Sequence, residues 1–156
     1  MVNLSTIGVQ FAYGVETAAG TKPTKFTAIP NCTAIGGISL EEDTIDVTPL
    51  EVDTRQYVAG LKDTGGKWTV TFNHTDDLDT KWAALKTASA AAAKTGLATW
   101  AEIYIPKLAK SCFVTFTPGD IPLNDISVGE ALQAEISNVI NEFKGWDTAV
   151  VPDAGE

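Results

Sequence analysis

The chain has very little of what an active site is usually built from. It contains one histidine, His74, and two cysteines, Cys32 and Cys112, among 156 residues. A general base needs a nucleophile or an orienting partner within reach, and no motif supplies one for His74. Neither cysteine has a metal-type partner nearby, so we interpret both as buried free thiols, with a disulfide as the alternative. We therefore expect no enzyme, no catalytic residue, no metal and no cofactor.

Long apolar runs and an excess of basic charge are also missing. A membrane-spanning helix needs on the order of 18 or more consecutive apolar residues. No stretch of the chain approaches that length, so the sequence predicts no such helix. The 20 acidic residues outnumber the 11 basic ones, which gives a formal net charge of −9 at pH 7. Such a surface repels nucleic-acid phosphates. It argues against DNA binding through a basic patch but is compatible with a wall that DNA slides along.

What the sequence does contain is a series of strand patterns and one helix pattern. Apolar stretches, several of them strictly alternating, predict strands over residues 32–40, 45–52, 67–73, 99–105, 111–117 and 131–140. The helix is expected over residues 76–95, after Thr75 as N-cap. Its apolar stripe consists of Leu78, Trp82, Leu85 and Ala92. Because strands dominate and mostly follow one another, we expect one mainly β domain with one α-helix: an antiparallel β-sandwich or half-barrel flanked by that helix.

Three segments fall outside this pattern. Residues 1–30 resemble an N-terminal arm whose alternating apolar residues should pack on something, such as another subunit. Residues 145–156 form a polar C-terminal tail. Residues 53–66 form a long loop, and connections beyond about 12–15 residues without regular structure are usually functional or disordered. Because Arg and Tyr are enriched at interface hot spots, we expect this loop to carry a subunit interface, with a mobile loop as the alternative. The residues expected to make the contacts are Arg55, Tyr57, Leu61 and Lys62.

Three further sequence patterns are similar to known ligand-binding or catalytic motifs but do not meet their requirements. Segment 60–67 is not a phosphate-binding loop, because an extra glycine intervenes and Trp68 follows the lysine where Ser or Thr is required. The acidic cluster at 76–79 lacks the alternating oxygens and distal glutamate of a calcium loop, and it suits a helix N-terminus. The acidic run over residues 41–53 contains enough carboxylates for a glycosidase pair, but spacing alone does not place two of them across a sugar.

Several short segments together resemble the tail tube (major tail) proteins of long-tailed bacteriophages. The likeness extends over roughly residues 14–140 and has no catalytic signature. It includes the long loop, which in that family reaches onto neighbouring subunits. The segments that carry it are residues 14–18, 29–31, 35–38, 44–50, 60–66 and 116–119.

The resemblance implies a structural virion protein that forms hexameric rings, which stack into a tube for DNA delivery. Its partners would be copies of itself and the tail tip and tail terminator proteins, with DNA passing through the lumen without specific binding. Its place would be the virion tail, after synthesis in the bacterial host cytoplasm. The alternative function is a β-sandwich binding or decoration module on a virion surface.

A tube of this kind needs a hydrated wall that repels phosphate. Acidic and small polar residues alternate with apolar ones on two of the expected strands. We therefore expect Glu102, Gln133 and Glu135 to face the lumen, although the polar face of each strand is equally compatible with the tube exterior.

Overall fold

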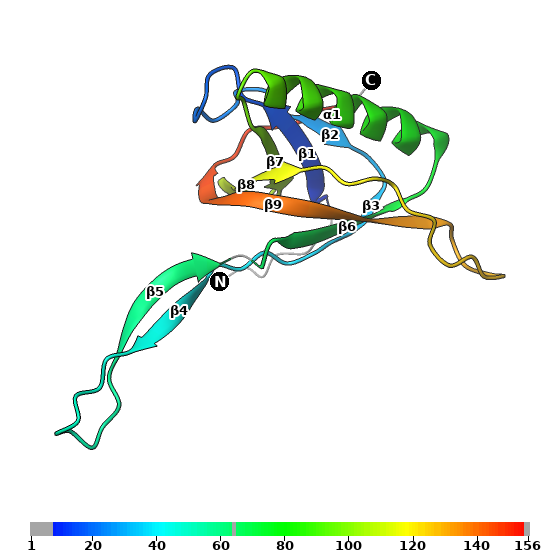
Figure 1. Ribbon diagram of the computed structural model, residues 1–156. Helices are drawn as coiled ribbons and strands as arrows, with labels where there is room; N and C mark the ends of the chain where they lie inside the picture. The colour runs from blue at the N-terminus through cyan, green and yellow to red at the C-terminus, as the bar shows by residue number, and fades with distance from the viewer. Residues whose placement is uncertain (1–7, 64, 155–156) are drawn as a thin grey trace.

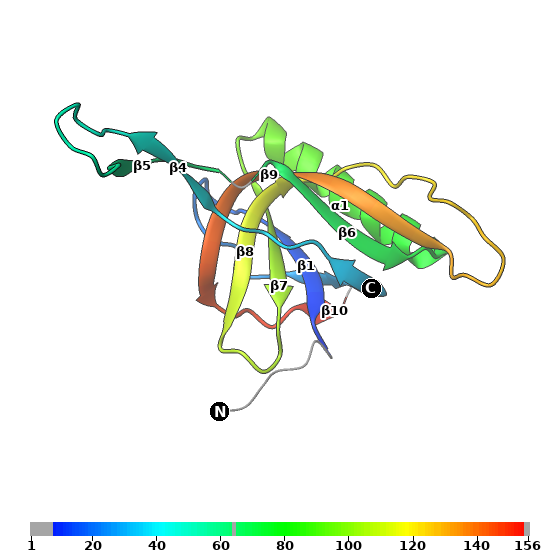
Figure 2. The ribbon, with the colours of Figure 1, turned by 90° about the horizontal axis from the view of Figure 1, so that it is seen from below.

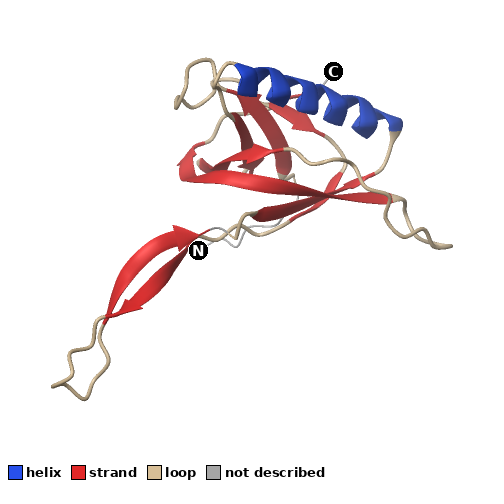
Figure 3. Ribbon diagram, viewed as in Figure 1, coloured by secondary structure: helices blue, strands red, loops and turns tan. Residues whose placement is uncertain are grey.

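The computed structural model describes residues 8–63 and 65–154. In this part of the chain, ten strands and one helix form a curved sheet, a separate hairpin and a covering helix (Figures 1 and 3). The elements are β1 (Gln10–Val15), β2 (Thr27–Ile29), β3 (Cys32–Ile35), β4 (Glu41–Asp46), β5 (Tyr57–Asp63), β6 (Lys67–Asn73), α1 (Asp76–Lys94), β7 (Thr99–Tyr104), β8 (Lys110–Thr117), β9 (Gln133–Thr148) and β10 (Asp153–Ala154). The predicted mainly β fold with one helix is confirmed.

The main sheet has eight strands in the order β10-β2-β1-β7-β8-β9-β6-β3. All its pairs are antiparallel except β10 with β2. The 16-residue strand β9 pairs with both β8 and β6, and the register of β8 against β9 shifts twice. Because such irregularities bend a strand and increase its twist, the sheet curls into a half-barrel (Figure 2). The barrel stays open, so β3 and β10 are sheet edges.

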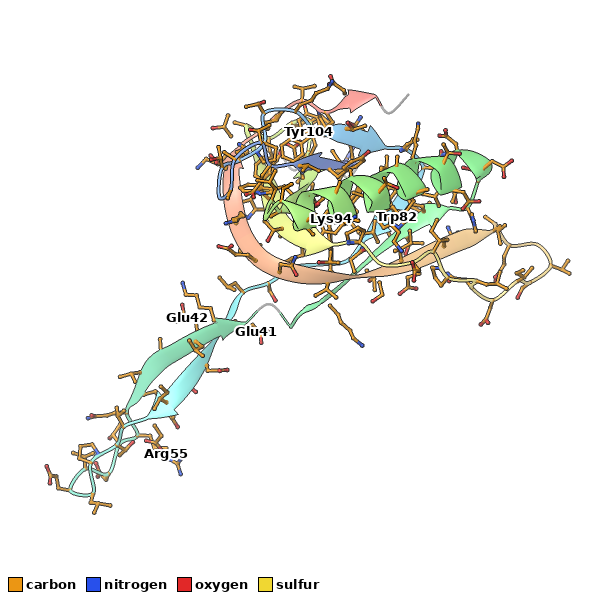
Figure 4. The ribbon with its side chains drawn as sticks, turned by 45° about the horizontal axis from the view of Figure 1, so that its top comes forward. Glu41, Glu42, Arg55, Trp82, Lys94 and Tyr104 are labelled. Carbon is orange, nitrogen blue, oxygen red and sulfur yellow. The ribbon has the colours of Figure 1, made fainter. Side chains whose placement is uncertain are left out.

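Helix α1 closes one side of the half-barrel. Thr75 caps it, since its Oγ1 accepts a hydrogen bond from the Leu78 N–H at 3.2 Å. This confirms the predicted cap. All four residues of the predicted stripe, Leu78, Trp82, Leu85 and Ala92, are buried. Figure 4 shows Trp82 on the helix, and its indole N–H donates to the Gly119 carbonyl at 2.8 Å. The described residues contain no helix both long and apolar enough to cross a membrane.

The first described residues are part of the core and not of an arm. Strand β1 lies between β2 and β7 in the middle of the sheet. The Phe11 side chain is fully buried and lies against four other aromatic rings. The predicted arm is therefore corrected for residues 10–15 and 27–29, while residues 1–7 lie outside the described part. The expected tail is also partly structured, because residues 145–148 continue β9 and β10 pairs with β2.

The sheet is covered on both faces around β7. One face packs into the main core, and the other carries a second apolar cluster formed by Ala12, Phe26, Trp100 and Phe113. The segment after β9 covers this cluster through Val150. Glu16 is buried beside it and accepts hydrogen bonds from the Trp100 indole at 2.8 Å and the Ala98 N–H at 2.9 Å. Both segments that looked like loose ends in the sequence therefore contribute to the interior.

Most predicted strands occur, but their boundaries differ. The strand at 67–73 matches β6 residue for residue, with Trp68, Val70 and Phe72 buried. The strand at 32–40 is shorter in the structure, and the one at 131–140 is longer. The strand expected at 45–52 is displaced: β4 starts at Glu41 and ends at Asp46. The polar first half of β4 gave no alternating apolar pattern in the sequence, because β4 has no buried face.

Gly119 is a position where a side chain has no room. A Cβ there would overlap with the Ser137 carbonyl oxygen, and the Gly119 N–H donates to Asn138 Oδ1 at 2.9 Å. We expect Gly119→Ala to lower the free energy of unfolding by about 2 kcal/mol or more, because the backbone must shift to relieve the overlap. Urea unfolding measures this. Gly37→Ala is the control, since a Cβ there meets nothing within 4 Å; equal losses in both variants would contradict the prediction.

Candidate subunit interface

Strands β4 and β5 form a two-stranded hairpin that projects away from the half-barrel (Figure 1). The strands pair from Glu41 with Asp63 at the base to Asp46 with Tyr57 near the tip. The register shifts between Glu42 and Thr44, which marks a bulge. The sequence predicted a long loop over residues 53–66, and this is corrected: half of that segment, Tyr57–Asp63, is a paired strand.

The tip of the hairpin, residues 47–56, is held by its own hydrogen bonds. The Val47 N–H donates to the Gln56 carbonyl at 2.9 Å, and the Gln56 N–H donates to Thr48 Oγ1 at 2.8 Å. The Thr48 hydroxyl and backbone N–H both donate to the Asp46 carboxylate, and these bonds lower the pKa of Asp46. The Arg55 guanidinium lies 3.8 Å from the same carboxylate. The tip is therefore shaped before it meets any partner.

Apolar side chains on the hairpin are exposed to an unusual degree. Leu50 at the tip is 106% exposed relative to its reference and Leu61 on β5 is 83% exposed. A single two-stranded hairpin is at best marginally stable in water, because it has no core on which to bury such residues. Exposed apolar patches of this kind mark interaction sites. The other exposed apolar residues of the hairpin are Ile45, Val47, Val52, Tyr57 and Val58.

The four residues expected at an interface all lie on this hairpin and all are exposed. Arg55 is at the tip, where Figure 4 shows it far from the body, and Tyr57 begins β5. Lys62 is near the base and forms an ion pair with Glu42 at 3.5 Å. The sequence reasoning did not include the apolar residues of β4 and the tip. The signal for them was present, since Ile45, Val47 and Leu50 belong to the run that was assigned to a separate strand.

A second exposed apolar segment lies between β8 and β9. The loop over residues 118–132 extends from the opposite side of the body from the hairpin in both views (Figures 1 and 2). Leu123, Ile126 and Val128 are 79%, 72% and 104% exposed. The chain thus presents apolar segments on two opposite sides, which is the arrangement expected of a subunit that contacts copies of itself on both sides.

The residues predicted to face a lumen do not share one surface. Glu102 is completely buried, so its assignment to an open wall is corrected. Its Oε2 accepts the Val150 N–H at 2.9 Å, and burial raises the pKa of this carboxyl. Glu135 is exposed and Gln133 half-buried on β9. Glu135 pairs with Thr71 of β6, and Gln133 with Asn73, so these two remain on a shared polar face of the sheet.

The remaining chemistry-bearing side chains have structural contacts. His74 Nε2 lies 2.8 Å from Asp79 Oδ1 in the first turn of α1, as expected for a residue at a strand-to-helix junction. Both cysteines are free thiols, with Cys112 buried and Cys32 half-buried. The described residues include no group of His, Cys, Asp and Glu that could hold a metal ion.

Solved structures with this architecture include the three that follow, whereas no protein-family model and no curated protein match the sequence. The first is a chain from the tail of an empty gene transfer agent particle with C6 symmetry: 16% identity, TM-score 0.57, covering 94% of this chain and 99% of that one. The second is from the six-fold symmetrised baseplate of the anti-feeding prophage: 7% identity, TM-score 0.59, covering 96% and 97%. The third is from the virion of a native gene transfer agent: 15% identity, TM-score 0.56, covering 94% and 99%.

The chain has the fold of proteins from phage-like tail particles. The match runs over nearly the whole length of both chains. At these identities the likeness concerns the fold alone. Within this tail-particle fold, the features that belong to this chain are its apolar hairpin tip, its polar β6–β9 face and its strongly acidic composition.

Proposed function

We propose that the chain is a structural tail tube protein of a phage or phage-like particle. Copies form hexameric rings through their sheet edges and hairpins, the rings stack into a tube, and DNA passes through it. The protein resides in the virion tail after synthesis in the host cytoplasm. Its partners are further copies and the tail tip and tail terminator proteins that begin and end the tube.

The observation that carries this proposal is the isolated hairpin. Its seven large exposed apolar side chains are not buried by the body of the same chain. A soluble monomer gains nothing from holding them in water, whereas an assembly buries them between subunits. The open edges β3 and β10 add a second reason, because uncovered edges favour pairing with another chain. The likeness to chains from particles with six-fold symmetry supports a ring of six.

The polar face of β6 and β9 is the proposed lumen surface. Glu135 and Gln133 lie there beside Thr69, Thr71 and Asn73. Carboxylates repel phosphate and small polar side chains bind water, so DNA slides without sticking.

We expect the double variant Gln133→Lys, Glu135→Lys to form normal tubes but to slow DNA delivery severalfold, because two lysines attract phosphate. The measurement is the rate of genome ejection from particles built with the variant. Thr87→Lys, on the exposed side of α1, is the control with added charge elsewhere. Unchanged delivery by the double variant means that this face does not line the lumen.

Electron microscopy of the purified protein at high concentration, with and without a tail-tip complex, tests the proposal. Tubes or end-on rings with six-fold symmetry are expected. Dispersed particles of one chain under all conditions would contradict it and would favour a decoration or binding module on a virion surface. A glycan array then tests that second function, because a sugar-binding module retains specific glycans without assembling.

A further inference from the structure

An apolar groove of about 490 Å³ opens on the side of the half-barrel. One wall is β3 with the start of the segment that links it to β4, which crosses the open side in Figure 2. The other wall is formed by neighbouring parts of β7, β8 and β9. Both cysteines of the chain line it. Trp146 lies at the groove and is 54% exposed, which is unusual for so large an apolar side chain. The other apolar lining residues include Ile35, Ile38, Ile103 and Ile105.

The groove is bordered by a basic turn. The turn between β7 and β8 carries Lys107, β8 begins at Lys110, and residues 105–110 include no acidic residue. Among the described residues, four lysines take part in no ion pair, and these two are half of that set. Asp147, on the neighbouring strand, is paired with Lys22 at 3.6 Å, and the more distant charge of Lys110 also helps to lower the pKa of Asp147. The turn therefore has positive charge to offer a partner.

The hairpin has the opposite charge. Its two cations are used internally, because Arg55 pairs with Asp46 and Lys62 with Glu42. Among the hairpin side chains that the structure describes, four further carboxylates have no ion pair: Glu41, Asp43, Glu51 and Asp53. Two of these, Glu51 and Asp53, alternate along the chain with the apolar tip residues Leu50 and Val52. An apolar tip between acidic residues is complementary to an apolar groove beside a basic turn.

We propose that this groove is the acceptor for the hairpin tip of a second copy of the chain. Leu50 of that copy enters the groove, while Glu51 and Asp53 approach Lys107 and Lys110. This deepens the proposed function and rests on it. The donor and acceptor surfaces are different parts of the chain, so the contact is heterologous and repeats from copy to copy as an extended assembly requires. In Figure 2 the turn points away from the hairpin, so one chain can donate and accept at once.

The loop over residues 118–132 is the alternative apolar occupant of the groove, and charge disfavours it. One of its three carboxylates, Asp120, is paired with Lys86. Only Asp125 and Glu130 remain, compared with four on the hairpin. The loop serves as the matched comparison, since Val128 and Leu50 are almost equally exposed, at 104% and 106%.

The native cysteines allow a direct test by cross-linking. We introduce Leu50→Cys, assemble the protein and oxidise it with copper–phenanthroline at mildly alkaline pH, because burial raises the pKa of Cys32 to about 11. Disulfide-linked dimers and longer ladders are expected on a non-reducing gel. They should disappear in Leu50→Cys combined with Cys32→Ala and Cys112→Ala. Val128→Cys with the native cysteines should give none.

The other outcomes overturn the proposal. Tubes of Leu50→Cys without cross-links mean that the acceptor groove is misassigned while the tube function stands. Cross-links from Val128→Cys instead of Leu50→Cys mean that the 118–132 loop, and not the hairpin tip, occupies the groove. A ladder that persists without the native cysteines means that the hairpin tips of two copies contact each other. If the wild type never assembles, the proposed function itself fails.

Charge reversal gives an independent readout. Lys107→Glu with Lys110→Glu should raise the protein concentration needed for assembly about tenfold, because it sets like charges against the incoming tip. Glu51→Lys with Asp53→Lys should restore assembly when combined with it. Lys94→Glu, which reverses another lysine without an ion pair, is the control. Equal effects of all reversals, or no rescue, contradict the pairing.

Discussion

A variant in which residues 41–63 are replaced by a short glycine-rich link is expected to fold as a stable monomer that no longer assembles. The hairpin contributes no residue to either buried cluster, so its removal leaves the core intact. Its first and last residues, Glu41 and Asp63, are direct partners across the hairpin. Paired residues lie about 5 Å apart, so a short link closes the gap without strain.

The size of the two expected effects differs sharply. The melting temperature should remain within a few degrees of the wild type, whereas tube formation should be lost altogether. Circular dichroism during heating and electron microscopy measure the two. Removing Arg55–Lys62 alone is a weaker experiment, because it takes away most of β5 and leaves β4 unpaired.

A milder variant separates the shape of the hairpin from its apolar surface. Val47→Ser with Leu50→Ser and Val52→Ser keeps the strands and the tip hydrogen bonds that hold them. It should also abolish assembly, because the apolar tip is what a partner buries. Tubes formed by the hairpin deletion would exclude the hairpin as an interface. An unfolded deletion variant would show that the body depends on it.

Phe11→Ala is expected to destabilise the monomer more than any surface change. Phe11 is fully buried, and its ring centroid lies 5.7 Å from that of Trp68, 5.8 Å from Phe72, 6.2 Å from Trp82 and 6.0 Å from Phe116. Truncating a buried phenylalanine to alanine costs about 3–5 kcal/mol, through lost transfer free energy and the cavity left behind. This is a large fraction of the roughly 5–15 kcal/mol by which domains are stable.

The measurement is the melting temperature, which should fall by roughly 10 °C for a domain of this size. Leu50→Ala is the control, because its side chain is fully exposed and should change the melting temperature little. The pair also decides between two roles for the N-terminal segment. If Phe11→Ala melted like the wild type but failed to assemble, the segment would be an arm that packs on another subunit and not a core strand.

The segments that sequence reasoning placed correctly are those whose pattern is set locally. Strand β6 alternates strictly, and α1 has a cap, an acidic first turn and a four-residue stripe. Each of these signals lies within one element, so no knowledge of distant partners is needed. The succession of strands along the chain is enough to predict a half-barrel. It does not predict that the half-barrel is open between β3 and β10.

Strand β1 was missed because its evidence is distant. Its apolar residues alternate, but Gly14 within it and Gly20 and Pro23 after it suggested an irregular arm. Its partner β7 begins at Thr99, more than eighty residues along the chain. The same distance explains the error at Glu102. Strand β7 looked amphipathic, and only the folded chain shows Val150 and the Phe26 cluster covering its second face.

Strand β5 was missed for the opposite reason, because it has almost no partners. It packs on no core, so its sequence carries no alternation, and Gly60 interrupts it. A Cβ at Gly60 would lie 3.2 Å from the Asp43 carbonyl oxygen at the bulge, which explains the glycine. Sequence reasoning nevertheless placed Arg55, just before this strand, and Tyr57, its first residue, at a subunit interface, because Arg and Tyr favour interfaces; that assignment stays a prediction.

Hydrogen exchange of the hairpin amides, before and after assembly, tests the central claim most directly. The claim is that another copy of the chain covers the hairpin. In the soluble protein, residues 41–63 should exchange quickly because both strands face solvent. In assembled tubes their exchange should slow by at least about tenfold, while amides in α1 change little. Tubes in which the hairpin exchanges as fast as in the monomer would contradict the account.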